Sequence, residues 1–190
     1  MARALHHVRP VRPYTSRRAN LPPAVRDFVS DPGSGGLPLS PAESRRFVDE
    51  RQFRFLVDLE VVKAQRLQYC VSVVSLAPNP ADTAVEVPMP HLVAGILRRI
   101  RATDVATQLS DGTLAVLLID AETMALNLVV GRMRAELMAV GGSAGSTAKW
   151  SAGGACYPKT AQSPTDLLRL ARELLGRALA DGGDRVYIAT

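Results

Sequence analysis

The 190-residue sequence lacks the cysteine patterns, the long apolar runs and the apolar leader that are typical of metal-binding, membrane and secreted proteins. Its two cysteines, Cys70 and Cys156, fit no metal-ligand or redox spacing, and each lies in a strand-like run, so we expect buried free thiols. No apolar run approaches the roughly 20 residues that a membrane helix needs. The N-terminus lacks the apolar core of a signal peptide. We therefore expect a cytoplasmic protein without a membrane span.

The charge of the chain is unevenly spread. The formal net charge of +5 would suit a nucleic-acid-binding protein, but five arginines fall before residue 20 with no acidic residue among them. The rest of the chain is close to balanced. Nucleic acid is therefore an unfavoured partner.

What the sequence does contain is typical of a soluble globular protein, with 47% hydrophobic and 22% charged residues. Residues 1–41 hold seven of the thirteen prolines, a composition that resists regular structure. We predict a flexible, Pro/Arg-rich N-terminal arm over residues 1–40, with a short helix at 24–29. One folded domain should follow over residues 41–190.

Residues 41–68 have a helical pattern with a clear start. Ser40 can cap the helix, Pro41 suits its first position, and Glu43 completes a capping box. Apolar residues at three- and four-residue spacing should form its buried face. These residues are Phe55, Leu56, Leu59 and Val62, with Phe47 two turns earlier.

A buried strand is predicted over residues 70–77 and a short amphipathic helix over 91–101. Two strand-like runs then follow, at 105–109 and 114–119. The pair Asp111-Gly112 lies between them, and such a pair is a strong signal for a β-hairpin with a type I′ turn.

The remaining chain alternates between helices and strands. Residues 121–140 are predicted as a helix, with Met124, Leu128, Met133 and Leu137 among its apolar positions. A strand at 147–157, a helix at 167–180 capped by Ser163, and a last strand at 185–189 complete the chain. This order implies an α/β (α+β) domain, in which helices pack on a mixed central sheet.

Three phrases in this order resemble the GGDEF family, the diguanylate cyclase domain with a palm-like nucleotide cyclase fold. They are RATDVATQLSDGTLAVLL, SAGGACYP and LLRLARELLGRALADGGDRVYI. The resemblance covers about residues 50–190, and it implies that the chain has this fold.

The sequence departs from the family where catalysis is concerned. Active members carry acidic residues at the third and fourth positions of the signature turn, where this chain has Gly112 and Thr113. Asp111 is displaced by one residue and should point elsewhere. The family's other metal-binding Asp has no counterpart in residues 75–78, and PNPADTAVEVPMP replaces its guanine-binding phrases. We therefore expect no enzyme activity, no bound metal and no cofactor.

A second site of the family is matched instead. Many members bind cyclic di-GMP through an Arg-x-x-Asp motif five residues before the turn, with a further arginine on the following helix. Arg101 and Asp104 match the motif, and Arg132 falls at the place of that arginine. The resemblance thus implies a catalytically inactive, degenerate domain of a bacterial signalling protein, acting as a cyclic di-GMP receptor.

The same residues allow a plainer interpretation. Arg101 and Asp104 could form an exposed pair three residues apart, and Arg132 could be a solvated helix residue. The domain would then be a ligand-free module for protein interaction or dimerisation, acting through the 41–68 helix or the basic arm. GTP binding without turnover is a third hypothesis, weakened by the lost guanine-binding phrases.

Overall fold

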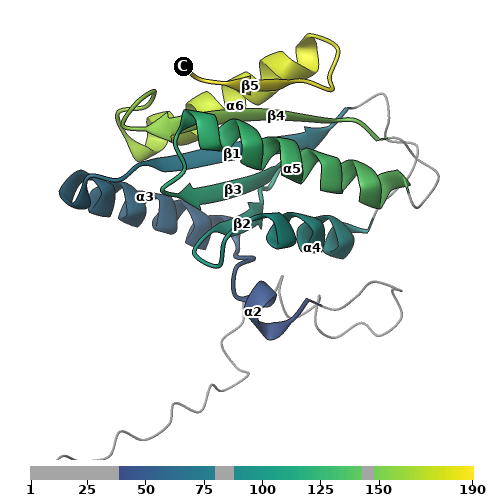
Figure 1. Ribbon diagram of the computed structural model, residues 1–190, viewed down its shortest axis with the longest axis horizontal. Coiled ribbons are helices and arrows are strands. Elements are labelled where there is room, and N and C mark those ends of the chain that lie inside the picture. The colour runs from purple at the N-terminus through teal and green to yellow at the C-terminus, as the bar shows by residue number, and fades with distance from the viewer. Residues whose placement is uncertain (1–38, 80–87, 143–147) are drawn as a thin grey trace, which may run out of the picture.

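A single five-stranded sheet lies at the centre of the computed structural model, which describes residues 39–79, 88–142 and 148–190 (Figure 1). Its strand order is β2-β3-β1-β4-β5. Strand β1 is antiparallel to β3 and to β4, β2 is antiparallel to β3, and β5 runs parallel to β4. The predicted mixed sheet is therefore confirmed. The strands are β1 (Val71–Pro78), β2 (Val105–Gln108), β3 (Leu114–Ile119), β4 (Trp150–Tyr157) and β5 (Val186–Ile188).

Two pairs of helices cover the two faces of this sheet. Helices α4 (Met89–Arg99) and α5 (Thr123–Gly142) pack on one face. Helices α3 (Glu50–Leu67) and α6 (Pro164–Ala180) pack on the other. Alternate residues of each strand supply the two apolar layers, as the strand period of two requires. The predicted helix at 24–29, nearly all of the N-terminal arm and residues 80–87 lie outside the described residues.

The predicted single helix over residues 41–68 is wrong, because the chain forms two helices, α2 (Pro41–Ser44) and α3. Between them, the Val48 N–H donates to the carbonyl of Ala106 (3.0 Å), and the Ala106 N–H donates to the carbonyl of Arg46 (2.8 Å). The segment thus pairs with the edge of β2. Asp49 then caps α3 by accepting from the Gln52 N–H at 2.7 Å.

The predicted apolar face of residues 41–68 is only partly correct, because Phe47 is buried and Leu56 packs partly buried against the core, whereas the other three residues are exposed. The core side of α3 consists of Phe53, Val57, Val61 and Ala64. Phe55 and Val62 are 62% and 55% exposed, and Leu59 is exposed as well. Both stripes have helical spacing, so the spacing alone could not separate them. On α5, Met133 and Leu137 are buried as predicted, whereas Met124 and Leu128 are exposed.

The hairpin between β2 and β3 forms as predicted, but its turn is not type I′. A type I′ turn needs positive φ at both central residues, and in this turn only Gly112 has it (φ 84°). The Gly112 N–H donates to the carbonyl of Leu109 (2.9 Å), and the Leu109 N–H donates to that of Thr113 (2.8 Å). A tight turn followed by a left-handed glycine matches the longer hairpin loops.

Close packing explains the small residues of β4. A Cβ atom on Gly153 would collide with the backbone of Ala171 and Leu175, so this glycine lets α6 approach the sheet. Both cysteines are buried free thiols, as predicted, and burial raises the pKa of Cys70 to about 12. Within the described residues, no helix combines the length and hydrophobicity that crossing a membrane requires.

Candidate functional site: an arginine-rimmed cavity between α4 and α5

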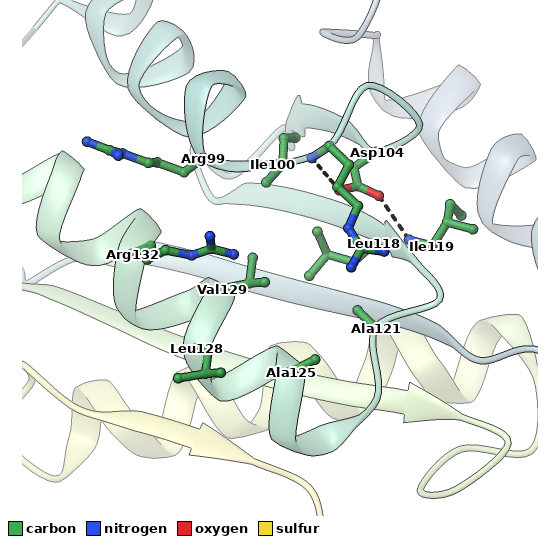
Figure 2. Close-up of a pocket in the computed structure, with 11 residues that line it drawn as sticks. Arg99, Ile100, Asp104, Leu118, Ile119, Ala121, Ala125, Leu128, Val129 and Arg132 are labelled. Carbon is green, nitrogen blue, oxygen red and sulfur yellow. Dashed lines mark hydrogen bonds between the residues drawn. The ribbon is translucent and has the colours of Figure 1, made fainter.

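All three residues predicted for ligand binding line one cavity of about 220 Å³. Arg101 and Asp104 come from the connection between α4 and β2, and Arg132 comes from α5. In Figure 2, the Arg132 side chain extends from α5 toward Leu118 and Asp104. Residues 31 positions apart in sequence therefore lie at one cavity.

The connection that carries Arg101 is held by an arginine from elsewhere in the chain. The Arg46 guanidinium donates to the carbonyls of Leu97 (2.9 Å) and Arg101 (3.0 Å). These carbonyls belong to the last turn of α4 and to the residues beyond it, which lack partners within the helix. A cation is also favoured at a helix C-terminus by the helix dipole. Arg46 therefore fixes the place from which Arg101 projects.

Asp104 is committed to the fold. The residue is 2% exposed, and its two carboxylate oxygens accept from the Arg101 N–H (2.7 Å) and the Ile119 N–H (3.0 Å). The Asp104 N–H in turn donates to the carbonyl of Arg101 (3.1 Å). Asp104 thus ties the turn to β3. The interpretation as an exposed pair with Arg101 is wrong for this residue.

The two predicted arginines differ from Asp104 both in their exposure and in the lack of a carboxylate partner for their guanidinium groups among the described residues. Arg101 and Arg132 are exposed, and neither guanidinium forms an ion pair with any described residue. Two unpaired, permanently charged groups that offer several N–H donors face the same cavity. Such an arrangement suits phosphate, carboxylate or the edge of a nucleobase.

A third arginine borders the cavity and was not predicted from the sequence. Arg99 lies at the end of α4 and donates to the carboxylate of Glu136 on α5 at 2.9 Å. Its side chain points away from Asp104 in Figure 2. Arg98 also donates to Glu136 (3.0 Å). Hydrogen bonds from Arg99 and Arg98 hold the pKa of Glu136 below its usual range. Counted with the two predicted arginines, four arginines lie at or near the cavity beside two acids, Asp104 and Glu136, so the local charge is positive.

The remaining walls of the cavity are apolar. Ile100, Leu118, Ala125 and Val129 line it, and Leu128 is 71% exposed at its edge. An apolar surface beside guanidinium groups can support the face of a planar ring. The apolar spacing of α5 could not predict this position of Leu128, because Leu128 has the same spacing as the buried residues of the helix.

The hairpin turn at the other end of β2 has a different character. The Asp111 carboxylate accepts from the Thr113 N–H (3.1 Å) and pairs with Arg172 of α6. Glu50 accepts from the Ser110 N–H (2.8 Å). Among the described residues, no group of three or more His, Cys, Asp or Glu side chains is placed to hold a metal ion.

The fold and this cavity define an α/β domain with a mixed sheet and a cationic pocket at the α4–β2 connection. No family model matches the sequence, and no curated protein matches it either. Solved structures do match it, and GGDEF domains are among them.

The GGDEF domain of YfiN (TpbB) from Pseudomonas aeruginosa is 17% identical, with a TM-score of 0.62 over 80% of this chain and 94% of that chain. The GGDEF domain of FimX from the same organism is 15% identical, with a TM-score of 0.64 over 80% and 99%. The GGDEF domain of DgcB from Caulobacter crescentus, in complex with c-di-GMP, is 13% identical, with a TM-score of 0.64 over 75% and 91%. The chain therefore has the GGDEF fold, as the resemblance predicted.

Proposed function

We propose that this chain is a receptor for cyclic di-GMP and that it has no diguanylate cyclase activity. The observation that carries the proposal is that two guanidinium groups at one cavity, those of Arg101 and Arg132, form no ion pair within the described part of the chain. Cyclic di-GMP offers two phosphates and two guanine edges, and planar guanidinium groups bind both kinds of acceptor. The DgcB neighbour was solved with this ligand.

The size of the cavity limits how the ligand can bind. Pockets that enclose a whole small molecule measure roughly 300–1,000 Å³. This cavity measures about 220 Å³, so it would hold one guanine with its phosphate and leave the other half outside. In this proposal Arg101 and Arg132 contact the ligand, the apolar wall beside Val129 supports the base, and Asp104 positions Arg101.

The absence of catalysis is proposed from the residues themselves. Gly112 and Thr113 occupy the positions at which active members of the family carry acids, and residues 75–78 contain none. Phosphoryl transfer depends on metal ions and the carboxylates that hold them. Any Mg²⁺-dependent formation of cyclic di-GMP from GTP by the pure protein would contradict this part of the proposal.

The receptor proposal is tested by calorimetric titration of the full chain with cyclic di-GMP. Arg101→Ala and Arg132→Ala should each weaken binding about tenfold or more, because each removes charge-assisted hydrogen bonds worth roughly 1.5–3 kcal/mol. Arg101→Lys should also weaken it, since lysine keeps the charge but not the fork of donors. Arg66→Ala, an exposed arginine on α3, is the matched control and should bind as the wild type does.

Two outcomes would contradict the proposal in different ways. Absence of heat with the wild type, at protein concentrations that detect weak binding, would refute the receptor function. Binding that survives both alanine substitutions would refute the site while leaving the function.

A second candidate function has an observation of its own, the exposed stripe of Phe55, Leu59 and Val62 on α3. The spacing of four and three residues is that of a helix-pairing seam. Asp58 and Lys63 flank it five residues apart, the spacing at which edge charges pair between two parallel helices. The stripe would therefore suit α3 of a second copy. Light scattering should then show a dimer that Phe55→Glu abolishes, and a monomer at high concentration would contradict it.

A further inference from the structure

A second cavity, of about 380 Å³, lies on the opposite face of the sheet, between α3 and α6. Its floor is formed by β1 and β3, and its walls come from α3, from α6 and from the end of β2. No part of the receptor proposal uses this cavity, and the whole sheet separates it from Arg101 and Arg132. Its lining includes Phe53, Arg54, Ser75, Ala115, Arg169 and Arg172.

The cavity follows from a row of small residues across three strands. Ala115 of β3 is opposite Ser75 of β1, and Ser75 is opposite Gly153 of β4. Above Gly153 the space is taken by the backbone of α6, at Ala171 and Leu175. Above Ser75 and Ala115 the space forms part of the cavity instead. The glycine draws α6 onto β4, and the two small neighbours leave a hollow beside it.

The floor of the hollow carries the hydroxyl group of a buried residue. Ser75 is 3% exposed and lines the cavity, and its hydroxyl forms no hydrogen bond with any described residue. The hydroxyl therefore keeps its donor and its acceptor sites for a polar atom of a ligand in the cavity. A valine or leucine here would continue the apolar layer of β1. The serine therefore gives the hollow a polar anchor.

The rim of the cavity is cationic. Three arginines and one acid, Glu173, line it. Each arginine pairs with carboxylates of the chain, namely Arg54 with Glu50, Arg169 with Asp166 and Glu173, and Arg172 with Asp111. The arginine side chains of these pairs are about half exposed, and ion pairs that are exposed to solvent contribute little to stability. An anion could therefore replace one of the carboxylates at little cost.

We propose that this cavity binds an amphipathic anion. The apolar body of the ligand would lie against Phe53, Leu109 and Leu168. A hydroxyl or amine near its inner end would bond the Ser75 hydroxyl, and its carboxylate, sulfonate or phosphate would meet the arginine rim. The site is independent of cyclic di-GMP, so either proposal can fail without the other.

The test uses two fluorescent probes with the same aromatic body, added to the full chain. 8-Anilinonaphthalene-1-sulfonate carries a sulfonate, and N-phenyl-1-naphthylamine is neutral. The anionic probe should bind at one saturable site, and Ser75→Leu should weaken it about tenfold or more by filling the hollow. The double variant Arg169→Gln/Arg172→Gln should weaken the anionic probe and leave the neutral one unchanged.

Ser151→Ala is the matched control. Ser151 lies on the same face of the sheet, and its hydroxyl is buried without a hydrogen-bond partner, but it lies outside the cavity lining. This variant should bind both probes as the wild type does. Ala115→Leu fills the hollow from the other strand and serves if Ser75→Leu does not fold, as circular dichroism would reveal.

Two results would overturn the proposal. The first is saturable binding of the anionic probe that the filled variant retains at wild-type affinity, which would place the probe elsewhere, for example on the exposed stripe of α3. The second is absence of saturable binding to the wild type.

Discussion

The two ends of strand β2 use charged residues in opposite ways. At the hairpin end, Asp111 is paired with Arg172 and with a backbone amide. At the α4 end, Arg101 projects beside the cavity without an ion pair to any described residue, and Arg132 faces it from α5. Only four residues of strand separate these ends.

The difference concerns which charges have their partners inside the protein. A carboxylate that is already bonded to an arginine and an amide stabilises a turn, and a ligand would have to displace those bonds first. A guanidinium group without a partner keeps its donors for a ligand. Asp104 shows that a charge bonded within the protein and a charge without an ion pair can be close neighbours. Its carboxylate accepts from two backbone N–H groups, and it lies three residues after Arg101.

The largest expected effect is a loss of folding stability when the buried carboxylate at the α4 end is removed. Asp104→Ala removes the acceptor of two backbone N–H groups in a buried place, at Arg101 and Ile119. The free energy of unfolding should fall by about 2–4 kcal/mol. Asp104→Asn keeps one oxygen but turns an N–H₂ group toward the other donor, so its loss should be intermediate. Urea denaturation measures both.

The control is the carboxylate at the other end of the strand. Asp111→Ala loses an exposed ion pair and one backbone hydrogen bond, so it should cost about 1 kcal/mol or less. Equal losses for Asp104→Ala and Asp111→Ala would show that the two ends are not distinct, and that Asp104 does not fix the turn.

Much of the fold could be predicted because its signals are local. The Ser163 cap of α6 and the hairpin at Asp111-Gly112 depend on neighbours a few residues away, and both formed. The break in the 41–68 helix could not be predicted in this way. It depends on pairing between Arg46–Val48 and Ala106, about 60 residues further along the chain. The Asp49 cap was the only local sign of it.

The candidate site likewise has a part that local motif spacing predicts and a part that depends on contacts between distant segments. Motif spacing predicted Arg101, Asp104 and Arg132 as site residues, and in the structure all three line one cavity. Spacing could not show that Asp104 is buried or that Arg46 holds the turn, because their partners lie on distant segments. The contacts that hold the site in place, made by Arg46 and Asp104, therefore could not be predicted from the sequence.

The smallest expected effect concerns Glu136, which among the described residues is the acid that pairs with an arginine of the cavity, Arg99. Hydrogen bonds from Arg99 and Arg98 hold its pKa below the ordinary value of 4.5. The carboxylate therefore stabilises the folded chain above that value, and the contribution is lost as the pH falls through the lowered pKa. Glu136→Gln should cost about 0.5–1 kcal/mol at neutral pH, given the half-exposed arginines, and nothing in strong acid.

The same substitution should act on the ligand in the opposite direction. Glu136→Gln releases Arg99 and removes one negative charge near the cavity, so cyclic di-GMP should bind about two- to fivefold more tightly. Glu173→Gln is the matched control, because it removes a carboxylate paired with Arg169 on the far face of the sheet and should leave the affinity unchanged. Weaker binding by Glu136→Gln alone would mean that Arg99 works only when Glu136 holds it in place. The free charge of Arg101 and Arg132 would then be insufficient, and paired residues would share the binding role at this end of the strand.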